Sequence, residues 1–310
     1  MQYGRGRDGF FYLHSELGIN KHQIKRIGRV SIDRVPITPP APPSPQTGTQ
    51  KENIRIIDLA VPMQSGMAHS AASVPFSMAL SRRHGDHDRT GQGGTAANAV
   101  IITGDHVGTH VDALCHVASK GVLCGGVAVA DACVGGKFVK LGAETIAPMV
   151  CRGVLLDIPA LKGVDRLEAG YGVTDRDLVE ALGDTPLNEG DVVLVRTGWI
   201  QLYGDEVAFL GDGTGVPGVD ASGGRWLANH GVRAAGGDTI AFEQVALGPK
   251  GRQRPCHGIL LWENAIHIIE VLDLEELARQ RVKEFMFVLS PLKLVGATGS
   301  PVRPLAVIEG

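Results

Sequence analysis

Three histidines and an aspartate lie within the eleven residues from His106 to His116, which read HVGTHVDALCH. The whole chain of 310 residues contains only eleven histidines, so this segment is enriched in metal-binding side chains. Two imidazoles with a carboxylate are typical ligands of Zn²⁺, Mn²⁺ or Fe²⁺, whereas Ca²⁺ and Mg²⁺ prefer oxygen ligands. The types and the spacing of His106, His110 and Asp112 therefore predict a site for a divalent metal ion.

These three side chains can reach one ion only if the backbone turns between them. On a straight strand, His106 and Asp112 would lie about 20 Å apart. On a regular helix, His106 and His110 would be neighbours, but Asp112 would point to another face. Gly108 stands between the two histidines, and glycine adopts the backbone conformations that sharp turns require. We therefore expect a loop or a bent strand end that turns at Gly108.

The elements around this segment are predicted from hydrophobic patterns. Thr174 caps and Gly183 ends a predicted helix over residues 174–182, and Asp273 with Glu276 predicts a capping box for a second helix. Short runs rich in β-branched and apolar residues predict five strands, over residues 54–61, 152–158, 191–199, 232–242 and 282–290. Strands mixed with short helices, in a chain with 42 glycines, indicate an α/β enzyme-like domain.

The first fifty residues differ in composition from the rest. They hold seven basic and three acidic residues, and the stretch PITPPAPPSP at 36–45 contains six prolines. Such a composition favours extended polyproline geometry and does not form a packed core. We expect residues 1–50 to be a basic, proline-rich, disordered tail or linker, followed by one domain over residues 51–310.

Composition also excludes several classes of protein. The net charge of −3 provides no electrostatic footprint for nucleic acid or for an anionic membrane surface. The chain shows neither an apolar run of membrane-spanning length nor a signal-peptide pattern, so we expect a cytoplasmic protein. An odd number of cysteines, five, argues against a disulfide scaffold.

The segment HVGTHVDALCH resembles the HxGTHxDxxxH signature of the metal-dependent cyclase family, which includes bacterial kynurenine formamidases and isatin hydrolases. Leu114 stands where many formamidases have proline, which suggests the longer subfamily. The resemblance covers about residues 51–310 and implies a mixed-sheet, swivelling β/α/β domain that assembles as a dimer or tetramer. Further segments resemble family blocks in the same order, namely IIDLAVPM (56–63), GDVVLVRTGW (190–199), GVPGVD (215–220), GGDTIAFE (236–243), HGILLWENAIHIIEVLDL (257–274) and SPLKLVGATGSPVRP (290–304).

The resemblance also implies roles for individual residues. His116 matches the histidine assigned to acid/base catalysis, and Asp112 matches a carboxylate able to bridge two ions. Glu263 and His267 are neighbouring rivals for the more distant ligand positions. One or two Zn²⁺ or Mn²⁺ ions are expected, and the family's metal ligands match five residues of this chain: His106, His110, Asp112, His257 and Glu270.

An aromatic or cyclic amide is the substrate class that the resemblance implies, such as N-formylkynurenine of tryptophan catabolism or an isatin-like lactam. Asp238, Thr239 and Trp199 are candidate substrate-binding residues. Asp58 is a candidate for orienting a ligand histidine, as metal-binding histidines usually require.

Three hypotheses about the function remain at this point. The first is an amidohydrolase in which a metal-activated water attacks the carbonyl and His116 moves protons. The second is a cyclase or dehydratase of secondary metabolism. The third is a non-catalytic protein in which the ion only stabilises the fold. A structural site of this kind needs no additional histidine beside its ligands.

Overall fold

The computed structural model describes residues 4–5, 11–12, 54–86, 93–246 and 254–309. The chain divides into two units, Met1–Thr49 and Gln50–Gly310. In the first unit, strand β1 (Gly4–Arg5) pairs antiparallel with β2 (Phe11–Tyr12). The rest of the predicted tail at 1–50 lies outside the described residues, so both the tail and the domain boundary at residue 50 stay predictions.

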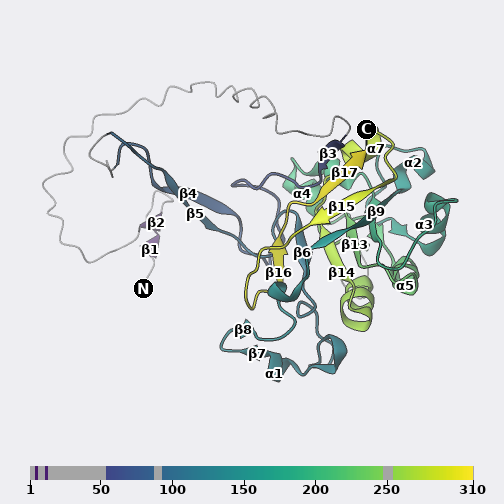
Figure 1. Ribbon diagram of the computed structural model, residues 1–310, viewed down its shortest axis with the longest axis horizontal. Coiled ribbons are helices and arrows are strands. Elements are labelled where there is room, and N and C mark those ends of the chain that lie inside the picture. Colours follow the sequence, from purple (N-terminus) through teal and green to yellow (C-terminus); the bar gives the residue numbers. More distant parts are fainter. Residues whose placement is uncertain (1–3, 6–10, 13–53, 87–92, 247–253, 310) are drawn as a thin grey trace, which may run out of the picture. The chain divides into compact units, whose positions relative to one another are not determined.

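A nine-stranded sheet forms the centre of the second unit (Figure 1). Strands β9, β11, β13 and β14 run parallel, and the pairs on both sides of them are antiparallel. The mixed α/β architecture expected from the sequence is therefore confirmed. In spatial order the strands are β16 (Gly299–Pro301), β6 (His110–Asp112), β14 (His267–Glu270), β13 (Ala234–Gly237), β11 (Val192–Arg196), β9 (Met149–Asp157), β15 (Glu284–Leu289), β17 (Leu305–Glu309) and β3 (Ile54–Asp58).

All five predicted strands form, although each is bounded differently from its prediction. Alternate side chains of β9 enter two different cores: Val154 and Leu156 pack on one face of the sheet, and Leu155 packs on the other. The first face is covered by α3 (Asp175–Leu182), α5 (Ala221–Asn229) and a π-helical segment, η4 (Gly258–Glu263), and α3 and α5 lie side by side (Figure 1). Burial on both faces explains why these strands read as continuous apolar runs.

The helix ends test the predicted caps. Thr174 accepts a hydrogen bond from the backbone N–H of Asp177, whose carboxylate accepts one from the N–H of Thr174, and Gly183 follows the last residue of α3. This prediction is confirmed. The capping box predicted from Asp273 and Glu276 is wrong.

Helix α7 (Glu275–Arg279) begins without a side-chain cap from its N-cap residue, Leu274. Asp273 does accept a hydrogen bond from the N–H of Glu275, at 3.2 Å, but Glu276 binds Arg279 one turn later instead of reaching back. The prediction fails because the guanidinium group is a stronger partner for the Glu276 carboxylate than a backbone N–H.

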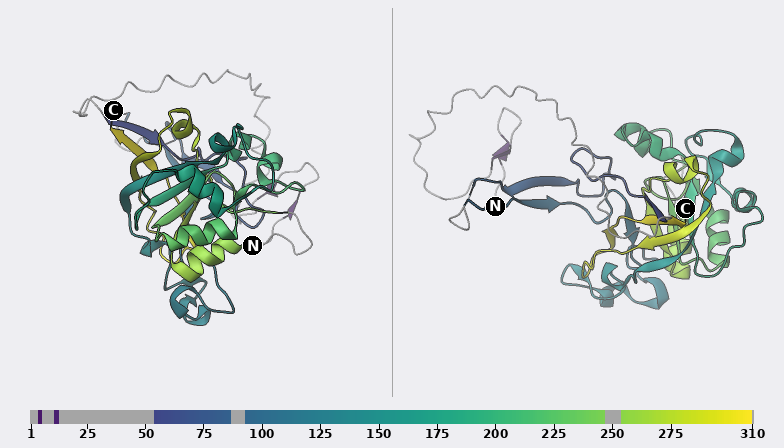
Figure 2. Two further views of the ribbon diagram at one scale, coloured as in Figure 1. Left: turned by 90° about the vertical axis from the view of Figure 1, so that its right-hand side faces the viewer. Right: turned by 45° about the horizontal axis from the view of Figure 1, so that its top comes forward.

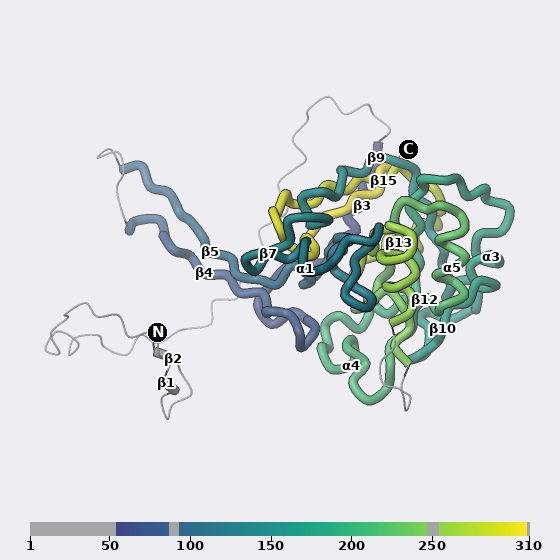
Figure 3. The backbone as a smooth tube through the Cα atoms, turned by 90° about the horizontal axis from the view of Figure 1, so that it is seen from below, coloured from purple at the N-terminus to yellow at the C-terminus, as the bar shows by residue number. Residues whose placement is uncertain are grey.

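The hairpin of β4 (Ser77–Arg82) and β5 (Asn98–Ile102) extends away from the large sheet, as the views in Figures 2 and 3 agree. Among the described residues, no helix combines the length and the apolar character needed to cross a membrane. The remaining short elements are η1 (Cys124–Gly126), α1 (Val129–Ala132), β7 (Cys133–Val134), β8 (Lys137–Phe138), η2 (Ala143–Thr145), α2 (Ile158–Lys162), β10 (Gly172–Val173), η3 (Trp199–Leu202), α4 (Glu206–Leu210), β12 (Gly218–Val219) and α6 (Pro255–His257).

Candidate metal centre

The segment that carries the first three ligands turns sharply before it enters β6. Gly108 has a φ of +68°, the left-handed conformation that glycine adopts without strain. Thr109 fixes the turn, because its hydroxyl accepts a hydrogen bond from the N–H of Val61 at 2.9 Å and donates one to the carbonyl of Val271 at 2.6 Å. The turn predicted at Gly108 is confirmed.

Replacing Gly108 with alanine should weaken this turn. The left-handed conformation costs an alanine about 1–2 kcal/mol, and its Cβ would lie 2.9 Å from the mobile end of Met67. We expect urea unfolding to show a loss of about that size, together with less bound metal per chain. Gly66→Ala is the matched control: Gly66 has a φ of +81° with open space around it, so its replacement should cost similar stability without changing metal content. Equal metal loss in both variants would contradict a specific role for the Gly108 turn.

Sheet pairing brings distant ligands to the same place. Glu270 of β14 stands opposite His110 of β6, and Gly299 of β16 stands opposite Asp112. His257 ends α6, directly before the π-helical segment η4. The structure therefore gathers residues that are about 150 positions apart in the chain around the side chain of Asp112.

The donor atoms lie at distances suited to a shared ion. The Nε2 atom of His110 is 3.6 Å from Oδ1 of Asp112 and 3.2 Å from Oε2 of Glu270. The Nε2 atom of His257 is 3.7 Å from Oδ2 of Asp112 and 3.4 Å from Oε1 of Glu270. On the other side, Nδ1 of His106 is 2.8 Å from Oδ1 of Asp112. Two ligand atoms that each lie about 2.1 Å from one tetrahedral metal ion are about 3.4 Å apart. The distances from His110 and His257 to the carboxylates are close to this value.

Four of these donor atoms are buried without a hydrogen-bond partner among the described residues: His110 Nε2, both carboxylate oxygens of Asp112, and Glu270 Oε1. A buried polar atom without a partner is costly, and native structures contain few of them. These four atoms lie close together, and a metal ion bound between them would give each of them a partner. The residues present thus fit a divalent cation: Asp112 lies near His106 and His110 on one side and near His257 on the other, where Glu270 also approaches His257.

A carboxylate behind His257 fixes the orientation of its ring. Glu243 is fully buried and accepts hydrogen bonds from Nδ1 of His257 and from the backbone N–H groups of Cys256, at 2.6 Å, and His257, at 3.2 Å. In the same way, Nδ1 of His110 donates to the carbonyl of Gly108 at 2.7 Å. Both rings therefore present Nε2 to the cluster, which is the usual arrangement of metal-binding histidines.

Glu243 is a functional residue that sequence reasoning missed. The candidate for orienting a ligand histidine was Asp58, which instead lies exposed and binds Arg303 at 2.8 Å. That hypothesis is wrong, because the exposed carboxylate of Asp58 accepts hydrogen bonds from Arg303 and from the backbone N–H of Ala60 instead of from a ligand histidine. A usable signal for Glu243 was its place as an acidic residue that ends the apolar stretch TIAF.

The cluster has the electrostatics of a cation site. Burial opposes charge on the imidazoles, but the contacts of His110 with Glu270, and of His257 with Glu243 and Glu270, raise the pKa of His110 to about 9 and that of His257 to about 10. Burial also opposes charge on Asp112, yet the neighbouring histidines hold the pKa of its carboxyl well below its usual range. A divalent ion would replace the ring protons as the positive partner of the carboxylates.

His116 lies beside the ligands. Its ring centroid is 4.1 Å from that of His106 and 5.9 Å from that of His257. One of its nitrogens lies within 4.8 Å of ligand atoms of Asp112 and His257, so its position also suits a ligand. Burial, together with the charges of His106 and His257, lowers the pKa of His116, which leaves a neutral ring able to accept a proton at neutral pH.

The two rival residues lie outside the cluster of donor atoms. Glu263 is exposed. His267 is half-buried, and its Nδ1 donates to the backbone carbonyl of Asp112 at 2.8 Å, so it supports a ligand's backbone.

The three candidate substrate-binding residues are all buried. Both carboxylate oxygens of Asp238 accept hydrogen bonds from the Thr197–Gly198 turn that follows β11. The indole N–H of Trp199 donates to the carbonyl of Phe209 at 2.8 Å, whereas the hydroxyl of Thr239 has no hydrogen-bond partner in the described part of the chain. Their role in substrate binding stays a prediction.

Replacing Asp238 with alanine should lower stability strongly. The change leaves two N–H groups and one hydroxyl buried without an acceptor, each at a cost of about 1–3 kcal/mol. We expect a loss of about 3–5 kcal/mol in chemical unfolding, against about 1 kcal/mol for the control Asp205→Ala, which removes only an exposed helix cap at α4. An unchanged stability with a raised KM would instead assign Asp238 to the substrate.

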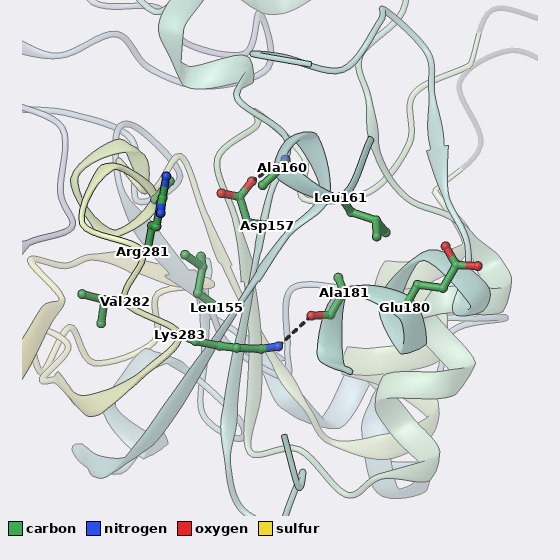
Figure 4. A pocket seen from close by; sticks show the side chains of 10 residues that line it. Leu155, Asp157, Ala160, Leu161, Glu180, Ala181, Arg281, Val282 and Lys283 are labelled. Atoms are coloured by element: carbon green, nitrogen blue, oxygen red, sulfur yellow. Dashed lines mark hydrogen bonds between the residues drawn. The ribbon is translucent and has the colours of Figure 1, made fainter. Parts of the chain in front are cut away.

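A hollow of about 380 Å³ lies away from the ligand cluster, among residues of β9, α2, α3 and the turn after α7 (Figure 4). Lys283, one of its two cationic residues, points toward the end of α3 and donates to the carbonyls of Ala181 and Leu182, at 2.9 and 2.6 Å. A lysine in this position stabilises a helix C-terminus. The hollow contains none of the predicted site residues.

Known proteins resemble the chain over most of its second unit. A crystal structure described as that of a novel cyclase has a TM-score of 0.73 and 28% identity, covering 81% of this chain and 88% of that one. Isatin hydrolase A from Ralstonia solanacearum has a TM-score of 0.64 and 25% identity, with coverages of 83% and 92%.

Sequence comparison agrees with these structures. Isatin hydrolase of Roseibium aggregatum is 30% identical over 125 residues, which are 39% of this chain and 46% of that enzyme, so the aligned part spans less than half of this curated relative. The family model described as "Putative cyclase" matches residues 57–244, more than half of the chain. With the signature histidines, the mixed sheet and the model match in agreement, the chain belongs to the putative cyclase family.

Proposed function

We propose that this protein is a metal-dependent hydrolase that cleaves the carbon–nitrogen bond of an amide, formamide or lactam. The observation that carries the proposal is the convergence of four buried, unpartnered donor atoms on Asp112, with His116 next to them. Isatin hydrolases are among the relatives, and isatin is a cyclic amide, which supports this substrate class. An arylformamidase-like substrate such as N-formylkynurenine belongs to the same chemical class.

Five residues would bind the metal ions that this reaction requires. His106, His110 and Asp112 would hold one ion, and Asp112 with His257 and Glu270 would hold a second. When bound, a divalent ion such as Zn²⁺ or Mn²⁺ lowers the pKa of water toward neutrality and polarises a carbonyl group.

His116 and Glu243 perform the remaining tasks. The neutral ring of His116 accepts the proton of the attacking water and then donates it to the leaving nitrogen, as a general base and acid in turn. Glu243 keeps the proton of His257 on Nδ1, so that Nε2 stays directed at the cluster while the charge of the substrate changes.

The test combines metal content with a substrate panel. Protein purified without chelators should contain one or two equivalents of zinc or manganese, measured by elemental analysis. It should then hydrolyse isatin or an aryl formamide faster than a lactone or a simple ester. Stoichiometric metal without turnover of any amide, formamide or lactam would refute the proposed activity and favour a cyclase, a dehydratase or a structural ion.

A further inference from the structure

The side of the His106 ring that faces away from Asp112 meets a short chain of polar groups. Its Nε2 atom lies 2.9 Å from the hydroxyl oxygen of Thr298, the residue before β16. That hydroxyl lies 2.8 Å from Oδ2 of Asp105, which also accepts hydrogen bonds from the backbone N–H groups of Thr298, at 2.9 Å, and Gly299, at 3.1 Å. All of these side chains are partly buried.

Counting protons along this chain fixes the state of the His106 ring. A hydroxyl carries a single hydrogen, and an ionised carboxylate can only accept. The hydrogen of Thr298 is therefore donated to Asp105, and toward His106 the hydroxyl oxygen can only accept. The Nε2 atom of His106 must then carry a proton. The atom whose lone pair is left for a metal ion is therefore Nδ1, which lies 2.8 Å from Oδ1 of Asp112.

The other two ligand histidines are held in the opposite tautomer. Nδ1 of His110 donates to the carbonyl of Gly108, and Nδ1 of His257 donates to Glu243, so both have their lone pair on Nε2. We propose that Asp105 and Thr298 are positioning residues that select the Nε2–H tautomer of His106 and thereby direct its Nδ1, unlike that of the other two rings, at the metal ion. This inference rests on the cation site of the proposed function.

The backbone of β16 is shaped to allow this contact. A Cβ atom on Gly299 would lie 2.7 Å from Cε1 and 3.0 Å from Nε2 of His106, so only glycine lets the strand approach the ring. Gly299 follows Thr298 directly and pairs with Asp112 in the sheet. The start of β16 therefore brings the Thr298 hydroxyl and the Asp112 carboxylate to the His106 ring. The start of β16 thus leaves room for the ring, and Thr298 together with Asp105 selects its tautomer.

Two measurements test the inference, the first on the unmodified protein. Long-range ¹⁵N–¹H correlation spectra of the zinc-loaded protein should show the ring proton of His106 on Nε2 and those of His110 and His257 on Nδ1. A proton on Nδ1 of His106 would overturn the proposal. If no metal binds, the proposed function fails, and spectra of the metal-free protein with neutral rings still decide the tautomer of His106.

The second measurement compares two substitutions at one position. Thr298→Val keeps the shape of the side chain but removes its hydroxyl, and Thr298→Ser keeps the hydroxyl. Zinc affinity, from competition with a chelator, should fall about 10- to 100-fold in the valine variant, as for other outer partners of ligand histidines, and should stay within about threefold in the serine variant. The valine spectrum should also lose the Nε2 preference of His106. Equal zinc affinity in wild type and Thr298→Val would refute the role of the hydroxyl.

Discussion

Replacing Asp112 with asparagine should remove bound metal and activity together. Asp112 has one carboxylate oxygen on each side of the cluster, Oδ1 toward His106 and His110 and Oδ2 toward His257. The change removes a negative charge from every donor set at once. Because the loss of an outer partner already costs about 10- to 100-fold in affinity, the loss of this shared ligand should weaken metal binding by more than 100-fold.

Elemental analysis of the Asp112→Asn protein should therefore find less than about a tenth of the wild-type metal. Asparagine keeps the shape of the side chain, and circular dichroism should show that the variant is folded, so that the loss of metal is not a loss of the fold. Asp177→Asn is the matched control: Asp177 is also buried, but it caps α3 and binds Lys162, so this variant should keep its metal. Full metal occupancy in Asp112→Asn would show that the cluster is not the metal centre.

Replacing His116 with alanine should separate catalysis from metal binding. The neutral ring beside the cluster is positioned to transfer protons, a contribution of typically about 10²- to 10⁴-fold. We expect kcat to fall by that factor while metal content stays at the wild-type level. Added imidazole should restore part of the activity, because it can occupy the space that the ring leaves.

His230→Ala provides the comparison for this variant. His230 is likewise half-buried, but its Nδ1 donates to the carbonyl of Trp226 at the end of α5, so its loss should leave kcat unchanged. A His116→Ala protein without metal would make His116 a ligand, an assignment that its distance from the donor atoms of Asp112 and His257 also permits.

Local patterns predicted the elements well. Runs of β-branched residues became strands of the central sheet, and Thr174 with Gly183 bounded α3, because these signals depend on neighbours within a few residues. The turn at Gly108 followed from the need to bring His106 and His110 together. The capping box at Asp273 failed for a reason that the local pattern does not contain, namely the competing contact between Glu276 and Arg279.

Contacts between distant segments were beyond reach from the residues alone. His257 and Glu270 entered as candidates only through the resemblance to a family, because nothing near them in sequence marks them as ligands. Glu243, Asp105 and Thr298 were missed, since each acts on a histidine through a tertiary contact. For Glu243 the sequence offers only its position after the stretch TIAF, and for Asp105 and Thr298 the contact becomes visible only when strand register is known.

The register of β6 has a consequence for the synthesis of the protein. The first ligands occupy residues 106–112, but β6 is held on one side by β14 and on the other by β16, which ends at Pro301. A nascent chain that has reached residue 250 carries His106, His110 and Asp112 but lacks both neighbouring strands and two further donors. The ion can therefore bind to all of its ligands only late in synthesis. Metal binding stabilises only those chains that have been translated almost to Pro301.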